Sequence, residues 1–200
     1  MSVQSQQLGG RLPLVDPKTM EGAQKDLYDR INTIMVPWAE AASFQSKTTN
    51  GRLIGPFNAM LFSPEISNAF LALQVAEQKH TSLSERVRQV VILSVGAVWK
   101  APYELYAHSA VGKKAGLSND AVRALARGQP SDELTNDERL AQQFTQQLTA
   151  DRRVEDALYQ AASAAFGEKG AVDMIVLVGC YQVVCSVLNA FEVPAPDLVG

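Results

Sequence analysis

Metal-binding and disulfide-forming residues are scarce in this 200-residue sequence, which contains two cysteines and two histidines. A catalytic zinc or iron ion needs at least three protein ligands, usually with more than one histidine among them. Cys180 and Cys185 are five positions apart in one expected helix, so their side chains diverge by about 140° and their Cα atoms lie beyond disulfide reach. We expect no metal site and no redox-active thiol pair, and no cofactor is predicted.

Clusters of positive charge and long uninterrupted apolar runs are also missing. The net charge is −3 and the 18 basic residues are scattered, which argues against a nucleic-acid partner. The N-terminus has no basic start followed by an apolar run, so no signal peptide is predicted. The longest apolar stretch, VDMIVLVGCYQVVCSVLNAF, is interrupted by Asp173, Gln182 and Asn189, and a core helix explains it better than a membrane span. We expect a cytoplasmic protein without a membrane partner.

Helix signals are present from end to end. Asp16–Pro17 predicts a helix that ends near Pro37, Ser63–Pro64 begins another, and Thr135-Asn-Asp-Glu138 is a capping box. The pattern predicts about eight helices and no strand, an all-α fold in a single domain over residues 13–200 after a flexible arm of residues 1–12. The longest irregular piece, around residues 38–62, is equally consistent with a loop that lines a site and with plain packing.

The segment 101–118, APYELYAHSAVGKKAGLS, places Glu104 four positions before His108. Residues with this spacing share one face of a helix, and Lys113 falls roughly opposite Glu104, so the pair is expected to point inward. A histidine held by a carboxylate can give and take a proton near neutral pH. A buried structural pair, in which two polar groups merely satisfy each other, is the alternative, and both interpretations stay open at this point.

The run RVRQVVILSVGAVWKAPYELYAHSAVGKKAGLS resembles the core of the carboxymuconolactone decarboxylase and alkylhydroperoxidase D (AhpD-like) superfamily. The resemblance covers about residues 50–130 and rests on the ordered pattern R-x-x-(E/Q)-x-x-(I/V)-L, Y-E-x-x-x-H and A-G-L-S. It implies an AhpD-like helical bundle that self-associates as a dimer, trimer or hexamer.

The sequence departs from the peroxidase-type members of that superfamily, which carry C-x-x-C-x-x-x-H. Aligned on His108, the two cysteine positions are occupied by Ala101 and Glu104, and the position of a proton-relay glutamate is occupied by Gln89. Peroxide reduction by this route needs a thiolate. Disulfide-based peroxidase activity is therefore not expected, although a peroxidase-related activity is kept as an alternative.

The remaining match is to the decarboxylase-like branch, which works without a cysteine pair. The resemblance implies a lyase that acts on a small, anionic lactone or carbonyl acid, with His108 as the acid–base residue and Glu104 orienting it. The other alternative is a non-catalytic ligand-binding or assembly protein. The expected substrate-binding residues are Arg52 and Asn58 for the anion, Gln89 as a hydrogen-bonding neighbour of the histidine, and Tyr103 and His80 in the pocket wall.

Overall fold

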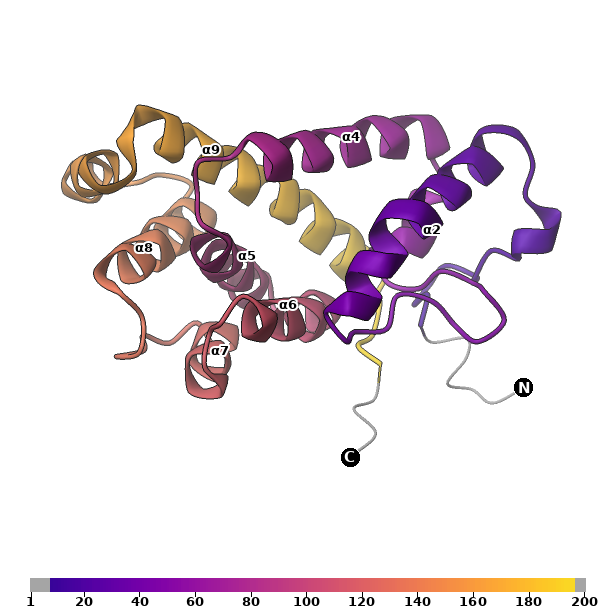
Figure 1. The fold of residues 1–200 in the computed structure, drawn as a ribbon, viewed down its shortest axis with the longest axis horizontal. Coiled ribbons are helices and arrows are strands. Elements are labelled where there is room, and N and C mark those ends of the chain that lie inside the picture. The colour runs from indigo at the N-terminus through magenta and orange to yellow at the C-terminus, as the bar shows by residue number, and fades with distance from the viewer. Residues whose placement is uncertain (1–7, 197–200) are drawn as a thin grey trace.

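The computed structural model describes residues 8–196, and within that range it contains eight α-helices, one short 3-10 helix and no strand. This confirms the all-α prediction (Figure 1). The elements in chain order are η1 (Pro17–Thr19), α2 (Gly22–Ala41), α3 (Pro56–Met60), α4 (Pro64–His80), α5 (Glu85–Trp99), α6 (Pro102–Lys114), α7 (Asn119–Ala126), α8 (Asn136–Asp151) and α9 (Asp156–Ala190).

Helix α5 is the centre of the first of two adjoining cores. Ser84 caps its N-terminus by accepting a hydrogen bond from the backbone N–H of Val87. Every residue from Val87 to Gly96 is buried, because α6, α7, α8 and α9 all pack against this helix (Figure 1). This buried stretch is mostly apolar, as expected of an enclosed helix, but it also includes Arg88 and Gln89.

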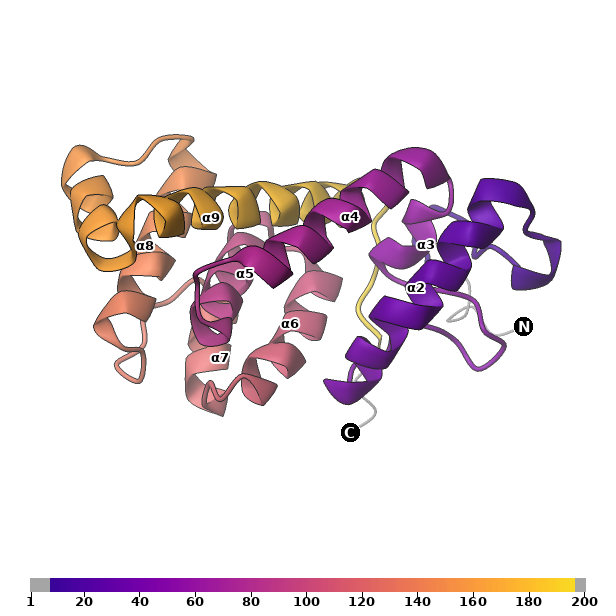
Figure 2. The same cartoon turned by 45° about the horizontal axis from the view of Figure 1, so that its top comes forward.

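The second core lies at the other end of the molecule, where α2 and α3 pack on α4, α6 and the C-terminal end of α9 (Figure 2). Helices α6 and α9 contribute to both cores. Tyr103 and Ala107 of α6 belong to the second core, whereas Ala101 just before α6 belongs to the first. The functional residues expected on α6 are therefore placed at the junction of the two cores.

The structure corrects the predicted helix after Asp16. Asp16 caps only the single turn η1, and the long helix α2 begins later and continues through Pro37. Proline removes one backbone hydrogen bond and strains the preceding turn, but Pro37 lies near the helix end, and Val36 and Ala39 beside it are buried. Packing of these side chains keeps the helix intact past the proline.

Part of the expected flexible arm lies outside the described residues, and the rest is packed. Within residues 8–12, Gly9 is buried and the backbone N–H of Arg11 donates a 2.7 Å hydrogen bond to the carbonyl of Phe191. The described part of the arm is thus attached to the end of α9.

Helix α9 is long and apolar enough to cross a membrane by length and composition alone, and 44% of its most apolar 18-residue window is buried. One face supplies core residues such as Met174, Leu177 and Cys185. At Gly167 the backbone (φ 69°, ψ 173°) is not helical, so α9 consists of two consecutive helices. In this fold the part of α9 after Gly167 packs one of its faces into the core.

Candidate active site

A close approach of α6 to α5 positions Glu104 and His108. Lys100, in the left-handed region with φ 51°, reverses the chain between the two helices. A Cβ atom at Gly96 would lie 3.0 Å from Leu105 and 3.3 Å from Cγ of Glu104, so a glycine at this point allows the helices to come together. Glu104 and His108 then point into the protein, with 3% and 4% of their surfaces exposed.

The two nitrogens of the His108 ring face different partners. Nδ1 lies 2.8 Å from Oε1 of Gln89, and Nε2 lies 3.3 Å from Oε1 of Glu104. The second contact is close enough for interaction but is not aligned as a hydrogen bond, and Glu104 Oε1 has no other partner within the described chain. In unliganded active sites, contacts of this kind are often long and tighten only when a ligand is bound. Oε1 of Glu104 is therefore a buried oxygen that is free to form a hydrogen bond with a bound molecule.

Aromatic rings enclose the imidazole on two sides. The ring of Tyr181 on α9 stands edge-on to His108 at 5.0 Å between centroids, and the Trp38 ring on α2 lies at 5.9 Å. Helices α2 and α9 thus limit the movement of the His108 ring.

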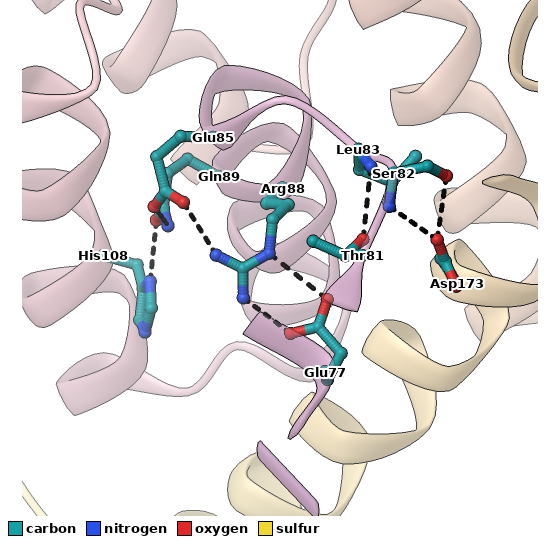
Figure 3. A network of polar contacts seen from close by, with 9 residues as sticks. All are labelled: Glu77, Thr81, Ser82, Leu83, Glu85, Arg88, Gln89, His108 and Asp173. Atoms are coloured by element: carbon teal, nitrogen blue, oxygen red, sulfur yellow. Dashed lines mark hydrogen bonds and ion pairs between the residues drawn. The ribbon is translucent and has the colours of Figure 1, made fainter. Parts of the chain in front are cut away.

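A chain of polar contacts continues from His108 to the far side of α5 (Figure 3). The amide Nε2 of Gln89 donates to Oε1 of Glu85 at 2.8 Å, and Nη1 of Arg88 donates to Oε2 of the same carboxylate at 2.7 Å. Arg88 also binds both carboxylate oxygens of Glu77, at 3.2 and 2.6 Å. The orientation of the Gln89 side chain is therefore held by a charged network.

Burial sets the protonation of the central pair. It raises the pKa of Glu104 to about 8, because no positive group compensates for the lost hydration of the carboxylate. Burial, together with the positive charge of Arg88, lowers the pKa of His108 to about 3. Near pH 7 the carboxyl is therefore mostly protonated and the imidazole neutral, so the pair is not an ion pair.

Glu104 and His108 form part of the wall of a cavity of about 340 Å³. This volume is near the lower end of the roughly 300–1,000 Å³ range of small-molecule sites. Among the described residues no lysine or arginine lines the cavity. Its wall is largely apolar, with aromatic contributions from Trp38, Phe44, Phe57, Phe70, Tyr181 and Phe191.

The structure brings four of the residues expected at the site together. Gln89 contacts His108 directly, next to Glu104. Tyr103 lines the cavity, and its hydroxyl donates a 2.7 Å hydrogen bond to the carbonyl of Gln45. The region predicted to be irregular also contributes, because Phe44 and the short helix α3 lie at the cavity.

Three other expected residues do not reach the cavity. Arg52 is paired with Asp16 at 2.8 Å, and the buried side chain of Asn58 holds the N-terminal segment through the backbone of Val15 and Pro13. His80 is exposed at the end of α4. Sequence spacing could not reveal these roles, because their contacts join segments far apart in the chain.

The two cysteines are free and buried. Burial raises the pKa of both thiols, so neither is present as a reactive thiolate near neutral pH. Within residues 8–196, no three His, Cys, Asp or Glu side chains gather as a set of metal ligands.

The sequence interpretation missed the aromatic neighbours and the charged network. Glu85 and Gln89 have the same four-residue spacing as Glu104 and His108, so their contact could have been predicted from helix periodicity. The pairing of Arg88 with Glu77 joins two helices and had no such local signal.

Comparisons with known proteins identify the fold. No protein-family model matches the sequence, and no curated protein matches it. An alkylhydroperoxidase AhpD core protein from Ralstonia eutropha JMP134, described as uncharacterized and peroxidase-related, superposes with a TM-score of 0.72 at 14% identity, covering 94% of this chain and 93% of that one.

Two further solved structures have a similar fold. An uncharacterized peroxidase-related protein from Silicibacter sp. TM1040 has a TM-score of 0.69 at 17% identity, over 98% of this chain and 96% of the other. A variant of the debrominase Bmp8 in complex with 2,3,4-tribromopyrrole has a TM-score of 0.71 at 13% identity, over 94% of both chains. The protein therefore has the AhpD-like fold that its sequence resembles.

Proposed function

We propose that the protein is an acid–base enzyme that transfers protons to and from a small, predominantly apolar molecule bound in the central cavity. The observation that carries this proposal is the Glu104–His108 pair. Both side chains are almost fully buried, they lie 3.3 Å apart, and both belong to the wall of an otherwise largely apolar cavity. Perturbed titratable groups in a concave site are typical of catalytic acids and bases.

The cavity favours an uncharged ligand over the anionic substrate suggested by the family resemblance. The described lining has no lysine or arginine, and Arg52 is engaged with Asp16. A carboxylate placed there would lose its hydration without gaining a counter-charge. One structural neighbour was crystallised with 2,3,4-tribromopyrrole, so a protein of this fold can hold a small substituted aromatic ring.

Decarboxylation of a lactone acid belongs to the same acid–base class, but its substrate carboxylate would have to be accommodated by neutral groups. The peroxidase-related alternative is weaker, because Ala101 and Glu104 stand where the thiols would be and because Cys180 and Cys185 are protonated core residues. Proton transfer to or from a carbon or oxygen atom of a substrate requires only an acid and a base, and Glu104 and His108 are present in the cavity wall.

The test is solvent-deuterium exchange, which needs no knowledge of the product. Small cyclic ketones, lactones and aryl ketones are incubated with the protein in D₂O, and deuterium at the position next to the carbonyl is followed by NMR. The panel includes carboxylic acid derivatives of these compounds. Each acid is compared with its own methyl ester, so that charge is the only large difference between the two. We expect exchange into the uncharged compounds and a loss of about 10²-fold or more in His108→Ala.

The matched control is His80→Ala, because His80 is the other histidine and is exposed outside the cavity. It should exchange like wild type. If wild type and His108→Ala bind the compounds equally and neither catalyses exchange, the protein is a binding protein and the acid–base proposal is wrong. Faster exchange into the acids than into their esters would favour the anionic substrate that the family resemblance implies.

A further inference from the structure

The Gln89 amide has two distinguishable ends, and its neighbours determine which end faces His108. Nε2 lies 2.8 Å from Oε1 of Glu85. An ionised carboxylate accepts hydrogen bonds and cannot donate them, so the amide NH₂ must face Glu85. The second oxygen of Glu85 accepts a hydrogen bond from Arg88 at 2.7 Å, so this carboxylate is an acceptor toward both neighbours.

The other end of the amide then determines the tautomer of His108. Gln89 Oε1 is only an acceptor, and it lies 2.8 Å from Nδ1 of His108. Nδ1 must therefore carry a hydrogen. A neutral imidazole has one N–H, so Nε2 has a free electron pair, and this nitrogen is the one 3.3 Å from Oε1 of Glu104.

A second proton on the imidazole is opposed by its surroundings. His108 is almost fully buried, and the positive charge of Arg88 further lowers its pKa. Burial of Glu104 without a cation favours its protonated form. The available proton between the two side chains is thus placed on the carboxyl group.

We propose that Glu104 is the proton donor and Nε2 of His108 the proton acceptor of a neutral acid–base pair, with Glu85 and Gln89 as positioning residues that hold His108 in the Nδ1–H tautomer. This rests on the proposed function and reverses the roles expected from the sequence, in which His108 is the acid–base residue and Glu104 orients it. It also predicts the reaction class, which is the relocation of a proton within one molecule.

The proton transfer balances without any co-reactant. The O–H bond of Glu104 breaks as its proton binds to one atom of the substrate, and Nε2 takes a proton from another atom of the same molecule. The products are the isomerised substrate, a carboxylate and an imidazolium. The ion pair then returns to its neutral form when the Nε2 proton crosses the 3.3 Å gap to Glu104. Keto–enol and double-bond isomerisations of small rings fit this scheme.

NMR of a variant that keeps the whole site decides which nitrogens of His108 are protonated. With ¹⁵N-labelled histidine, His80→Ala leaves His108 as the single histidine, and its two nitrogens report the tautomer by NMR. We expect a protonated Nδ1 and an unprotonated Nε2 between about pH 5 and pH 7. Infrared spectra should also contain a protonated carboxyl band that is lost in Glu104→Gln.

A matched pair of variants tests the positioning residues. In Gln89→Leu the acceptor at Nδ1 is removed, and we expect loss of the pure Nδ1–H tautomer. In Gln78→Leu, a change on α4 that leaves the His108 contact intact, the tautomer should be kept. A wild-type imidazole that is protonated at both nitrogens, or at Nε2 alone, overturns the assignment. Because deuterium exchange could persist in that case, this failure is distinguishable from failure of the proposed function.

Discussion

At the scale of single residues, the site depends on two titratable groups kept neutral by burial. Glu104 and His108 each have less than 5% of their surface exposed, so hydration of a charge on either one is lost on folding. The cation closest to them in the network, Arg88, is already paired with Glu77 and Glu85. The positive charge of Arg88 is thus compensated within the network, and the neutral pair faces the cavity.

The raised pKa of Glu104 predicts a loss of stability toward alkaline pH. A carboxyl with a higher pKa in the folded than in the unfolded chain stabilises the fold fully below its ordinary pKa of 4.5 and loses this contribution as the pH rises through about 8. His108 acts in the opposite sense, since its lowered pKa gives a contribution that is present above 6.5 and is lost as the pH falls through about 3.

We therefore expect that the free energy of unfolding attributable to the pair is level between about pH 4.5 and 6.5, where the two effects offset, and falls from about pH 6.5 to 8. Urea denaturation at a series of pH values measures this free energy of unfolding. In Glu104→Gln, which cannot ionise, the alkaline fall should be smaller than in wild type. Identical pH profiles of the two proteins would contradict a raised pKa at Glu104.

At the scale of elements, the cavity depends on how the segment before α3 approaches α6. Gly55 has φ 64° and ψ −146°, and a Cβ atom on it would lie 2.3 Å from the Tyr103 ring. Tyr103 cannot easily move away, because it is 1% exposed and its hydroxyl is hydrogen-bonded to Gln45. The loop and the helix are thus in direct backbone-to-ring contact beside the cavity.

Gly55→Ala should destabilise the protein by at least roughly 2 kcal/mol, because it adds both backbone strain and overpacking. Thermal and urea unfolding measure the change. The control is Gly179→Ala, at a helical glycine with no neighbour within 4 Å of the added carbon. That variant should be neutral or more stable by roughly 0.5–1 kcal/mol. Equal stability of the Gly55 variant and wild type would show that the contact is not close.

At the scale of the whole molecule, an apolar face of α9 remains exposed. Val172, Ile175, Val176 and Val183 are between 37% and 59% exposed, and Ile66 on α4 is 73% exposed. Contiguous exposed apolar surface is typical of protein or membrane contact sites. The family resemblance implied self-association, and this face of α9 is where we expect it.

We expect wild type to be a dimer, trimer or hexamer in analytical ultracentrifugation. Val172→Glu should shift it toward the monomer, because a charge would be buried in the interface without a partner. Arg127→Glu, which changes a charge on the exposed end of α7, serves as the control and should leave the oligomer unchanged. A monomeric wild type at micromolar concentrations would rule out this interface.

Local signals accounted for the helices and for the central pair. The cap at Thr135 was readable because an N-cap bonds to a backbone group within three residues. Glu104 and His108 were found because helix periodicity determines which face a residue occupies. The path of α2 through Pro37 was not predicted, since burial of Val36 and Ala39 opposes the local penalty.

By itself, then, the sequence determined the all-α fold, the inward-facing pair on α6 and the absence of thiols at the two aligned positions, because each depends on neighbours a few residues apart. Only the tertiary structure decided the character of the cavity. It joined Arg52 to Asp16 and surrounded His108 with Trp38 and Tyr181. Those contacts connect residues far apart in the chain, so the hydration and charge at the site are set by packing between helices.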